Sequence, residues 1–511
     1  MTTAADRVLT NAEVHTLADP DETYEAVAIR DGEIVRLDSA YEIDFLVGVD
    51  TDVVDCGGRT VVPGFVDAHT HMQQLGQYQV HADLSDAGSA DEAVETLASD
   101  AADDGDWLLG FGWDESGWGE PRYLTREDLD RVSDERPVAA VRVDMHTAAL
   151  NSVALERLRD EMPADDVRTD DGEPTGVVVE DAVEPVWDAI DPDPAETHEL
   201  LTAARDYAHR HGVTAVHDMV RQSHAPRVYR ELNLEDALDL RVRINYWSDH
   251  LDAVREAGLR TNHGSEFVRT GAIKSFTDGS FGGRTAKLSE PYADDPEETG
   301  TWVVDPGELR DITTKADDAG LQCTVHAIGD EAVEETLSAF EATADPGAAR
   351  HRVEHVELAT DEHVERFAES GVVASCQPNF LQWADEGGLY DQRLGEDRRK
   401  LSNRYRDLLD AGVHLAFSSD TMPMDPLLGV GLAVSASSEH QRISVTEALR
   451  AYTLGGAYAG FDEDRMGTVE VGKVADFAVL EASPWEVDAD EIRDIDVAMT
   501  VVDGEVVYDG R

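Results

Sequence analysis

The chain alternates short apolar runs with helical stretches, and this alternation constrains its fold more than any other feature. Several helical stretches end in a glycine that leads into the next apolar run, as at His211-Gly212, Ala319-Gly320 and Ser370-Gly371. Glycine commonly follows the last turn of a helix, and the pattern is typical of parallel βα units. The eight expected strands are Val61–Val66, Thr214–His217, Val242–Tyr246, Ala272–Phe276, Gln322–His326, Arg352–Val356, Val372–Cys376 and His414–Ser418.

Eight such units predict an α/β fold, a (β/α)8 TIM barrel, over residues 61–460. The 511 residues leave room for more than a barrel, which needs about 250. The first two expected strands stand too far apart for one crossover, so we expect an inserted subdomain, a lid, over 80–195. Short β-like runs with turn residues at both ends of the chain predict a composite β-sandwich domain formed by 1–60 and 461–511.

The charge balance excludes some classes of partner. Asp and Glu number 108 against 42 Lys and Arg, a net charge of −66. Such a field repels nucleic acid and anionic membranes, so neither is an expected partner. Only five of the 42 basic residues are lysines. The composition is typical of halophiles that accumulate salt, and it predicts that the folded state needs molar salt.

Cysteine usage and hydropathy predict a cytoplasmic protein. The three cysteines, Cys56, Cys323 and Cys376, are far apart in the sequence and show no CxxC spacing, so neither a disulfide framework nor a zinc-thiolate site is expected. The longest apolar runs are about ten residues, too short to cross a bilayer. The acidic start of the chain does not have the pattern of a signal peptide.

Six polar side chains stand at the ends of expected barrel strands. Catalytic groups of such barrels lie at the carboxyl ends of the strands. The histidines at 69 and 71 are two residues apart, which puts both side chains on one side of an extended segment. Imidazole and carboxylate are common ligands of zinc, and manganese, cobalt and iron accept them too. The six residues, which together predict a divalent metal site, are His69, His71, Lys274, His326, His355 and Asp420.

Four motifs carry a family resemblance. The run VVPGFVDAHTH at 61–71 resembles the strand-one signature of the amidohydrolase superfamily. GAIKSFTDGS at 271–280, VHAIGD at 325–330 and RVEH at 352–355 resemble amidohydrolase family 3, the branch that includes N-substituted formamide deformylases. The similarity spans nearly the whole chain, to VADF at 474–477.

The resemblance implies a metal centre of one or two ions, with zinc the expected metal. His69 and His71 would bind the first ion, and His326 and His355 the second. Asp420 would bind the first ion and serve as the proton shuttle.

The resemblance also implies that carbon dioxide carboxylates Lys274, and that the resulting carbamate bridges the two ions. Chemistry gives an independent reason for such a bridge. An ammonium group cannot donate to a cation, whereas a carbamate is an anionic ligand with two oxygens. The alternative for Lys274 is a salt bridge with one of the many carboxylates.

Further residues are candidates for contacts with the substrate or the metal ligands. Asp114 and His146 match the inserted region of the family-3 branch, and Trp113 and His146 are expected to fold over the barrel mouth; packing of the insert is the alternative. Arg284 follows the lysine strand on a glycine-rich loop. The predicted substrate-binding residues are Trp113, Asp114, His146 and Arg284. Weaker candidates are His217, Asp218, Glu354, Gln377 and Asn379, while Cys56 is expected to be simply buried.

Together these features predict a hydrolase that uses metal-activated hydroxide to cleave a non-peptide C–N bond in a small molecule, either an amide or an N-acyl or N-formyl amine. A homodimer is the expected assembly.

One alternative to this hydrolase is a deaminase of a heterocyclic amine. Relatives of that kind lack the strand-four lysine and carry a glutamate three residues after the strand-five histidine, where this chain has Gly329. Another is a non-catalytic scaffold, which would have lost ligands that this chain retains.

Overall fold

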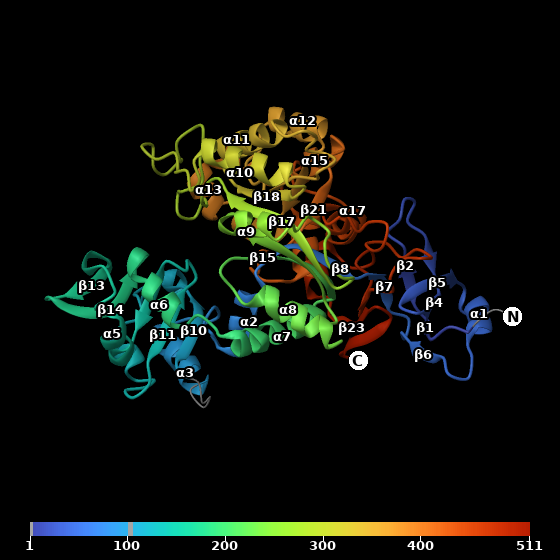
Figure 1. The fold of residues 1–511 in the computed structure, drawn as a ribbon, viewed down its shortest axis with the longest axis horizontal. Coiled ribbons are helices and arrows are strands. Elements are labelled where there is room, and N and C mark those ends of the chain that lie inside the picture. The colour runs from blue at the N-terminus through green and yellow to red at the C-terminus, as the bar shows by residue number, and fades with distance from the viewer. Residues whose placement is uncertain (1–3, 101–105) are drawn as a thin grey trace. The chain divides into compact units, whose positions relative to one another are not determined.

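A computed structural model describes residues 4–100 and 106–511 (Figure 1). Contacts within the chain divide it into two compact units. The first, here called the barrel unit, comprises Met1–His71 and Arg205–Arg511, and the second, the insert unit, comprises Met72–Ala204. The predicted insertion, 80–195, lies inside the second unit.

Eight parallel strands form one sheet in the barrel unit, and each strand pairs with the next one along the chain. This sheet confirms the predicted (β/α)8 barrel. The backbone N–H of Asp420 donates to the carbonyl of His69 over 2.9 Å, which links the ends of the first and last strands. The strands are β8 (Phe65–Thr70), β15 (Val213–Val220), β16 (Arg241–Trp247), β17 (Val268–Phe276), β18 (Gln322–Ala327), β19 (Arg352–His355), β20 (Val373–Cys376) and β21 (Leu415–Phe417).

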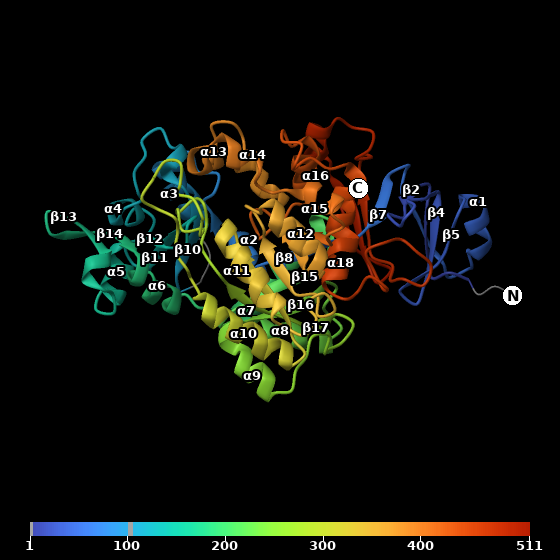
Figure 2. The same ribbon diagram turned by 90° about the horizontal axis from the view of Figure 1, so that it is seen from above.

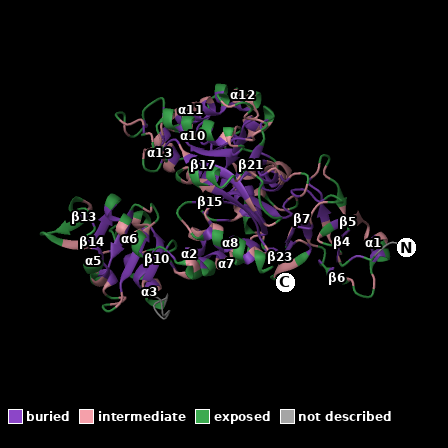
Figure 3. Cartoon of the chain, in the orientation of Figure 1, coloured by how far each residue is buried: buried purple, intermediate pink, exposed green. Residues whose placement is uncertain are grey.

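The strand residues are buried almost throughout, and the exposed surfaces belong to the helices outside them (Figure 3). A parallel sheet covered by helices buries both of its faces, which explains the continuous apolar runs. Glycine ends a helix as expected, since Gly371 follows α12 (Asp361–Ser370) with a φ of 70°. Helices of the barrel unit include α8 (Ala225–Leu234), α9 (Leu251–Glu256), α10 (Pro306–Asp318), α11 (Asp330–Glu341), α12 (Asp361–Ser370), α15 (Tyr405–Asp410) and α16 (Pro426–Ser435) (Figure 2).

The predicted boundaries of the first barrel strand are wrong. The run expected at Val61–Val66 is divided at Gly64 into β7 (Thr60–Pro63) and β8. β7 pairs with β2 and β22 in a sheet of the terminal segments, whereas β8 enters the barrel. A side chain at Gly64 would come within 2.2 Å of Thr214 Oγ1 on β15, so only glycine allows this close approach. His69 therefore lies within the first barrel strand, and only His71 follows it.

Both ends of the chain contribute to a pair of β-sheets. One sheet has the order β5-β4-β1-β6 and the other the order β24-β23-β22-β7-β2-β3. Residues of both sheets, among them Leu9, Val27 and Phe477, share one hydrophobic core. The strands are β1 (Arg7–Thr10), β2 (Glu13–His15), β3 (Thr23–Tyr24), β4 (Ala26–Arg30), β5 (Glu33–Asp38), β6 (Asp52–Asp55), β22 (Phe477–Leu480), β23 (Val497–Val502) and β24 (Glu505–Asp509).

The insert unit has its own six-stranded sheet, in the order β13-β14-β12-β11-β10-β9. Two separate clusters of buried apolar residues pack within this unit. Among the residues that the structure describes, no helix is long and apolar enough to cross a membrane. The strands of the insert unit are β9 (Ala82–Asp83), β10 (Leu108–Trp113), β11 (Val138–Arg142), β12 (Thr147–Leu150), β13 (Val167–Asp170) and β14 (Glu173–Val179).

Candidate metal centre

Three side chains at the carboxyl end of the barrel could hold one metal ion. Potential ligand atoms of His69, His71 and Asp420 all lie within 4.8 Å of one another. Oδ1 of Asp420 is 3.5 Å from Nε2 of His69 and 3.3 Å from Nε2 of His71. Two imidazoles and a carboxylate are a donor set that suits zinc and similar divalent ions.

The closure of the barrel brings these residues together. Oδ1 of Asp67 accepts the backbone N–H groups of His69 and Ser419 over 3.1 and 3.2 Å. Oγ1 of Thr421 accepts the backbone N–H of His71 over 2.9 Å. Asp420 and Thr421 both have positive φ, 53° and 64°, a conformation that non-glycine residues seldom adopt. The tight turn after β21 thus directs the Asp420 carboxylate toward the two histidines.

Lys274 on β17 extends this group. Its Nζ lies 3.4 Å from Nε2 of His69 and 4.7 Å from the ring centre of Phe276. The side chain is fully buried, and burial lowers the pKa of its ammonium to about 8. The charges of Glu354 and Asp420 act on this ammonium, but within the described residues these carboxylates pair with His69, His71 and Arg352 rather than with Nζ.

His326 on β18 and His355 on β19 lie beside the same group. Their ring centres are 4.3 Å apart, and the ring of His355 is 5.2 Å from that of His69. Nδ1 of His355 is buried and has no hydrogen-bond partner among the described residues, as expected of an atom that binds a ligand. His326 donates from Nε2 to the carbonyl of Gly279 over 3.0 Å, which leaves its Nδ1 free to bind a ligand. The structure therefore brings all six predicted residues to one end of the barrel.

The electrostatics match a cation site. Burial, followed by the nearby charge of Lys274, holds the pKa of the His69 imidazole well below its usual value. The pKa values of His326 and His355 are likewise far below the usual range because of burial and of the cationic groups beside them. Burial alone would raise the pKa of Asp420, but His69, His71 and Lys274 lower it overall. Neutral imidazoles and an ionised carboxylate are the forms that bind metal.

Glu354 orients His69, the role that the sequence left open for it. Its Oε2 accepts from Nδ1 of His69 over 2.8 Å, while its Oε1 pairs with Nε of Arg352 at 2.8 Å. A neutral imidazole that donates from Nδ1 presents the lone pair of Nε2, the atom nearest to Lys274 and Asp420. Burial favours the protonated form of Glu354, yet Arg352 and Lys274 hold its pKa below the usual range.

Two weaker candidates support the turn that carries Asp420. Gln377 donates from Nε2 to Oγ of Ser418 over 2.9 Å, and Asn379 donates from Nδ2 to the carbonyls of Ser419 and Met422. Their side-chain oxygens are buried without a hydrogen-bond partner in the described part of the chain.

The remaining candidates of the barrel unit lie outside the six-residue group. Arg284 pairs with Asp294 at 2.8 Å. His217 contacts Arg352, with Nδ1 and Nη1 at 2.8 Å, and Asp218 accepts from the hydroxyl of Tyr229. Cys56 is buried in the core of the terminal sheets, as expected.

Three predicted substrate-binding residues lie in the insert unit, and each contacts other residues of that unit. Trp113 has no exposed surface and donates from Nε1 to the carbonyl of Ala140 over 3.0 Å. Packing, the alternative given above, explains this tryptophan. Asp114 pairs with Arg142, and His146 is an exposed side chain 3.5 Å from Glu180. A substrate role for Asp114 and His146 stays a prediction.

One buried carboxyl that organises the site, Asp278, is not among the residues predicted from the sequence. Asp278 accepts the backbone N–H groups of Ile328, Gly329 and Lys287 over 2.7 to 3.0 Å, and its Oδ1 is 3.5 Å from Nε2 of His326. It joins the segments that follow β17 and β18. The signal was present, since Asp278 stands four residues after Lys274 in the motif at 271–280, but acidic residues are too common in this chain for one to stand out.

Comparisons with known proteins identify the family of the chain. The sequence profile of the amidohydrolase family matches residues 52–508. The chain is 31% identical to YtcJ of Bacillus subtilis, an amidohydrolase by its name, over 97% of this chain and 98% of that protein. It is 26% identical to the N-substituted formamide deformylase of Arthrobacter pascens, over 100% of this chain and 99% of that enzyme.

A solved structure is similar to this chain in both fold and sequence. The crystal structure of a metal-dependent hydrolase from Pyrococcus furiosus superposes with a TM-score of 0.81 at 31% identity, covering 94% of this chain and 100% of that one. The chain belongs to the amidohydrolase family.

Proposed function

We propose that this amidohydrolase is a metal-dependent enzyme that cleaves the C–N bond of an N-acyl or N-formyl amine. The observation that carries the proposal is the convergence of His69, His71 and Asp420 within 4.8 Å, beside the buried amine of Lys274. The similarity to an N-substituted formamide deformylase supports the choice of bond.

The residues of the chain have separate tasks in this reaction. A divalent metal, when bound, lowers the pKa of water toward 7 and polarises a carbonyl group. His69, His71 and Asp420 would hold this ion, and Glu354 fixes the ring of His69. The Asp420 carboxylate takes a proton from the attacking water and delivers it to the leaving nitrogen. Its lowered pKa keeps it ionised at neutral pH, ready to act as the base.

Lys274 is proposed to react with carbon dioxide. Only the neutral amine attacks carbon dioxide, and the burial that lowers the pKa of Lys274 to about 8 makes this form accessible. The amine nitrogen forms a bond to the carbon of carbon dioxide and loses a proton, which leaves an anionic carbamate. This carbamate would bridge the first ion and a second ion held by His326 and His355.

The backbone at Gly329 also disfavours a deaminase. A Cβ atom at Gly329 would come within 2.0 Å of the carbonyl oxygen of Lys287. A glutamate at this place, which the family resemblance implies for a deaminase, therefore does not fit the backbone here.

Elemental analysis combined with turnover tests the proposed function. We expect the purified protein to contain one or two equivalents of a divalent metal and to hydrolyse members of a panel of N-formyl and N-acyl amines. Chelation should abolish turnover, and added zinc, manganese or cobalt should restore it. A metal-free protein that is inert on the whole panel, before and after metal addition, would contradict the proposal.

A further inference from the structure

Two aromatic side chains stand beside the predicted metal ligands. Trp247 ends β16 and Phe276 ends β17, so both lie at the carboxyl end of the barrel. Their ring centres are 5.0 Å apart, and the ring of Trp247 is 6.5 Å from that of His71. Both side chains are partly exposed, as are His71 and Asp420. The accessible surface of the site therefore has an apolar part, here called the aromatic wall, which consists of Trp247 and Phe276.

Contacts on both sides hold the aromatic wall in place. The ring of Phe276 stacks on that of His326, with the ring centres 4.7 Å apart. The guanidinium group of Arg221 lies over the ring of Trp247 at 5.5 Å, and Arg221 is itself paired with Asp249 at 2.9 Å. An apolar surface that is already ordered binds a ligand without the entropic cost of fixing its own side chains.

The aromatic wall lies across the barrel from the proposed proton shuttle. β17 is the fourth strand from β21 in either direction around the sheet, which the hydrogen bond between Asp420 and His69 closes. In a closed barrel of eight strands, two strands that stand four places apart face each other. Phe276 and Asp420 therefore belong to opposite sides of the barrel mouth.

This placement orients an amide at the site. Asp420 is proposed to deliver a proton to the leaving nitrogen, so the nitrogen must lie on the side of β21. The substituents of a planar carbonyl carbon diverge from one another, so the substituent on the acyl side points away from the nitrogen. On this geometry the acyl substituent points toward the aromatic wall.

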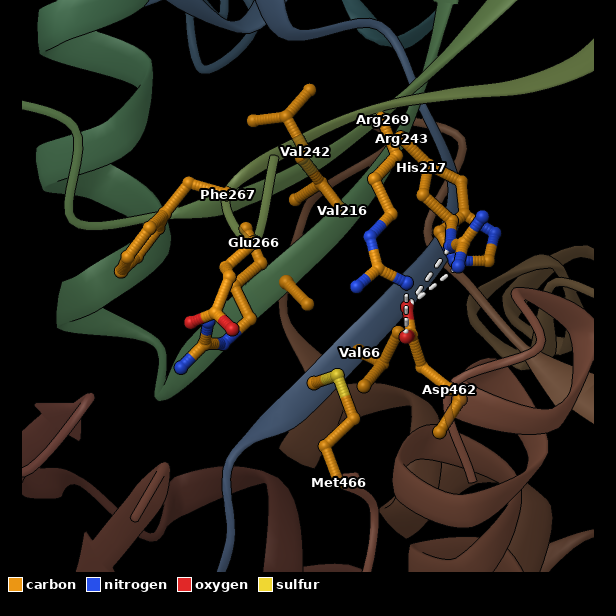
Figure 4. Close-up of a pocket in the computed structure, with 13 residues that line it drawn as sticks. Val66, Val216, His217, Val242, Arg243, Glu266, Phe267, Arg269, Asp462 and Met466 are labelled. Carbon is orange, nitrogen blue, oxygen red and sulfur yellow. Dashed lines mark hydrogen bonds and ion pairs between the residues drawn. The ribbon is translucent and has the colours of Figure 1, made fainter. Parts of the chain in front are cut away.

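The cavity at the other end of the barrel is too small for such a substituent. It lies at the amino ends of the strands and has a volume of about 20 Å3, which is room for about one water molecule (Figure 4). Asp462 pairs there with Arg243 at 2.6 Å and with Arg269 at 2.8 Å. An apolar group of the substrate therefore has its place at the carboxyl end, against the aromatic wall.

We propose that the substrate is an N-acyl amine with an apolar acyl group that packs against Trp247 and Phe276, rather than an N-formyl amine. This inference rests on the proposed function. The oxygen of water bonds to the acyl carbon as the C–N bond breaks, and a proton passes by way of Asp420 to the nitrogen. The products are an apolar carboxylic acid and a free amine. A formyl group has only hydrogen in place of the acyl substituent and would bury none of the aromatic wall.

Binding of the carboxylic acid product tests the aromatic wall without turnover. Calorimetric titration of the metal-loaded full chain in molar potassium chloride compares hexanoate with acetate, which carry the same charge. Hexanoate should bind at least about 10-fold more tightly, because its longer alkyl chain is removed from water. Equal affinities for the two acids would overturn the inference.

A variant locates this difference on the wall. Trp247→Ala should lose most of the preference for hexanoate, while its affinity for acetate and its metal content stay at the wild-type values. Trp485→Ala, which removes a partly exposed tryptophan stacked on His15, is the matched control and should keep the preference. An unchanged preference in Trp247→Ala would contradict the wall. If Trp247→Ala fails to fold, the comparison of the two acids in the wild-type protein still decides.

Turnover separates this inference from the proposed function. With one amine and a series of formyl, acetyl, butanoyl and hexanoyl groups, kcat/KM should rise by at least about 10-fold from acetyl to hexanoyl. Hydrolysis without any such rise would overturn the inference and still support the proposed function. Tight binding of hexanoate without hydrolysis of any member would support the aromatic wall and contradict the proposed reaction.

Discussion

Lys274 is one of the largest fully buried side chains of the protein, and one of only five lysines in it. We expect Lys274→Ala to lose most of the activity and at least one equivalent of metal, because the variant lacks the proposed bridging ligand. Lys315→Ala, which removes an exposed lysine on α10, is the matched control and should behave as the wild type. Metal content by elemental analysis and turnover would be measured together. Wild-type values of both in Lys274→Ala would refute the bridge.

The pH dependence of carboxylation follows from the pKa of the same residue. With a pKa of about 8, about a tenth of the Lys274 amine is neutral at pH 7 and about nine tenths at pH 9. At a fixed concentration of dissolved carbon dioxide, carbamate formation in the metal-free protein should therefore become faster as pH rises through 8. Incorporation of 13C-labelled carbon dioxide, followed by NMR, measures this rate. A rate that is independent of pH between 7 and 9 would show that the amine is not the reacting group.

Asp420 is expected to contribute more to the reaction rate than to metal binding. Asp420→Asn keeps an oxygen ligand but removes the base, so the variant should retain some metal while kcat falls by about 10²–10⁴-fold. Turnover at saturating substrate, normalised to bound metal, is the measurement. An unchanged kcat would remove the assignment as proton shuttle.

Residues whose partners come from distant segments were the hardest to place from the sequence. That the six residues of the candidate metal centre lie together could be predicted, because strand ends in a parallel barrel meet at one edge. Glu354 was only a weaker candidate from the sequence, because its contact with His69 joins β19 to β8 across 285 residues. Burial is also hard to predict from a motif: Trp113, a predicted substrate-binding residue, has no exposed surface in the structure.

At the scale of elements, the boundary between the terminal sheets and the barrel depends on Gly64. The sequence VVPGFV is apolar throughout, so its hydrophobicity cannot show that the first half pairs with β22 and the second with β15. Only the glycine marks the division, because the backbone there approaches Thr214 too closely for a side chain.

Gly64→Ala should therefore destabilise the fold. The added methyl group would overlap Thr214 and force a backbone shift, which typically costs about 1–3 kcal/mol. Gly117→Ala is the control, because a Cβ there meets no atom within 4 Å. Chemical denaturation measures the free energy of unfolding of both variants. Equal stabilities of the two would mean that the close approach at Gly64 is not needed.

At the scale of the whole molecule, like charges dominate the surface. Helix α12 is an example, since Glu362, Glu365 and Glu369 are all exposed on it within two turns. Carboxylates three and four residues apart on a helix repel each other, and with a net charge of −66 this repulsion extends over the entire protein. The TIM barrel itself could be predicted without this information, because charge at exposed positions does not change the apolar pattern.

Screening by salt should decide whether the protein stays folded. The Debye length falls from about 10 Å at 0.1 M to about 3 Å at 1 M, so molar salt removes most of the repulsion between surface carboxylates. We expect Tm to rise steeply between 0.1 and 2 M in both potassium chloride and potassium glutamate, since general screening does not distinguish the anions. The double variant Glu365→Gln/Glu369→Gln should unfold at a higher temperature than the wild type in dilute buffer and at nearly the same temperature in molar salt. Full stability of the wild-type protein in dilute buffer would show that packing and ion pairs outweigh the surface repulsion.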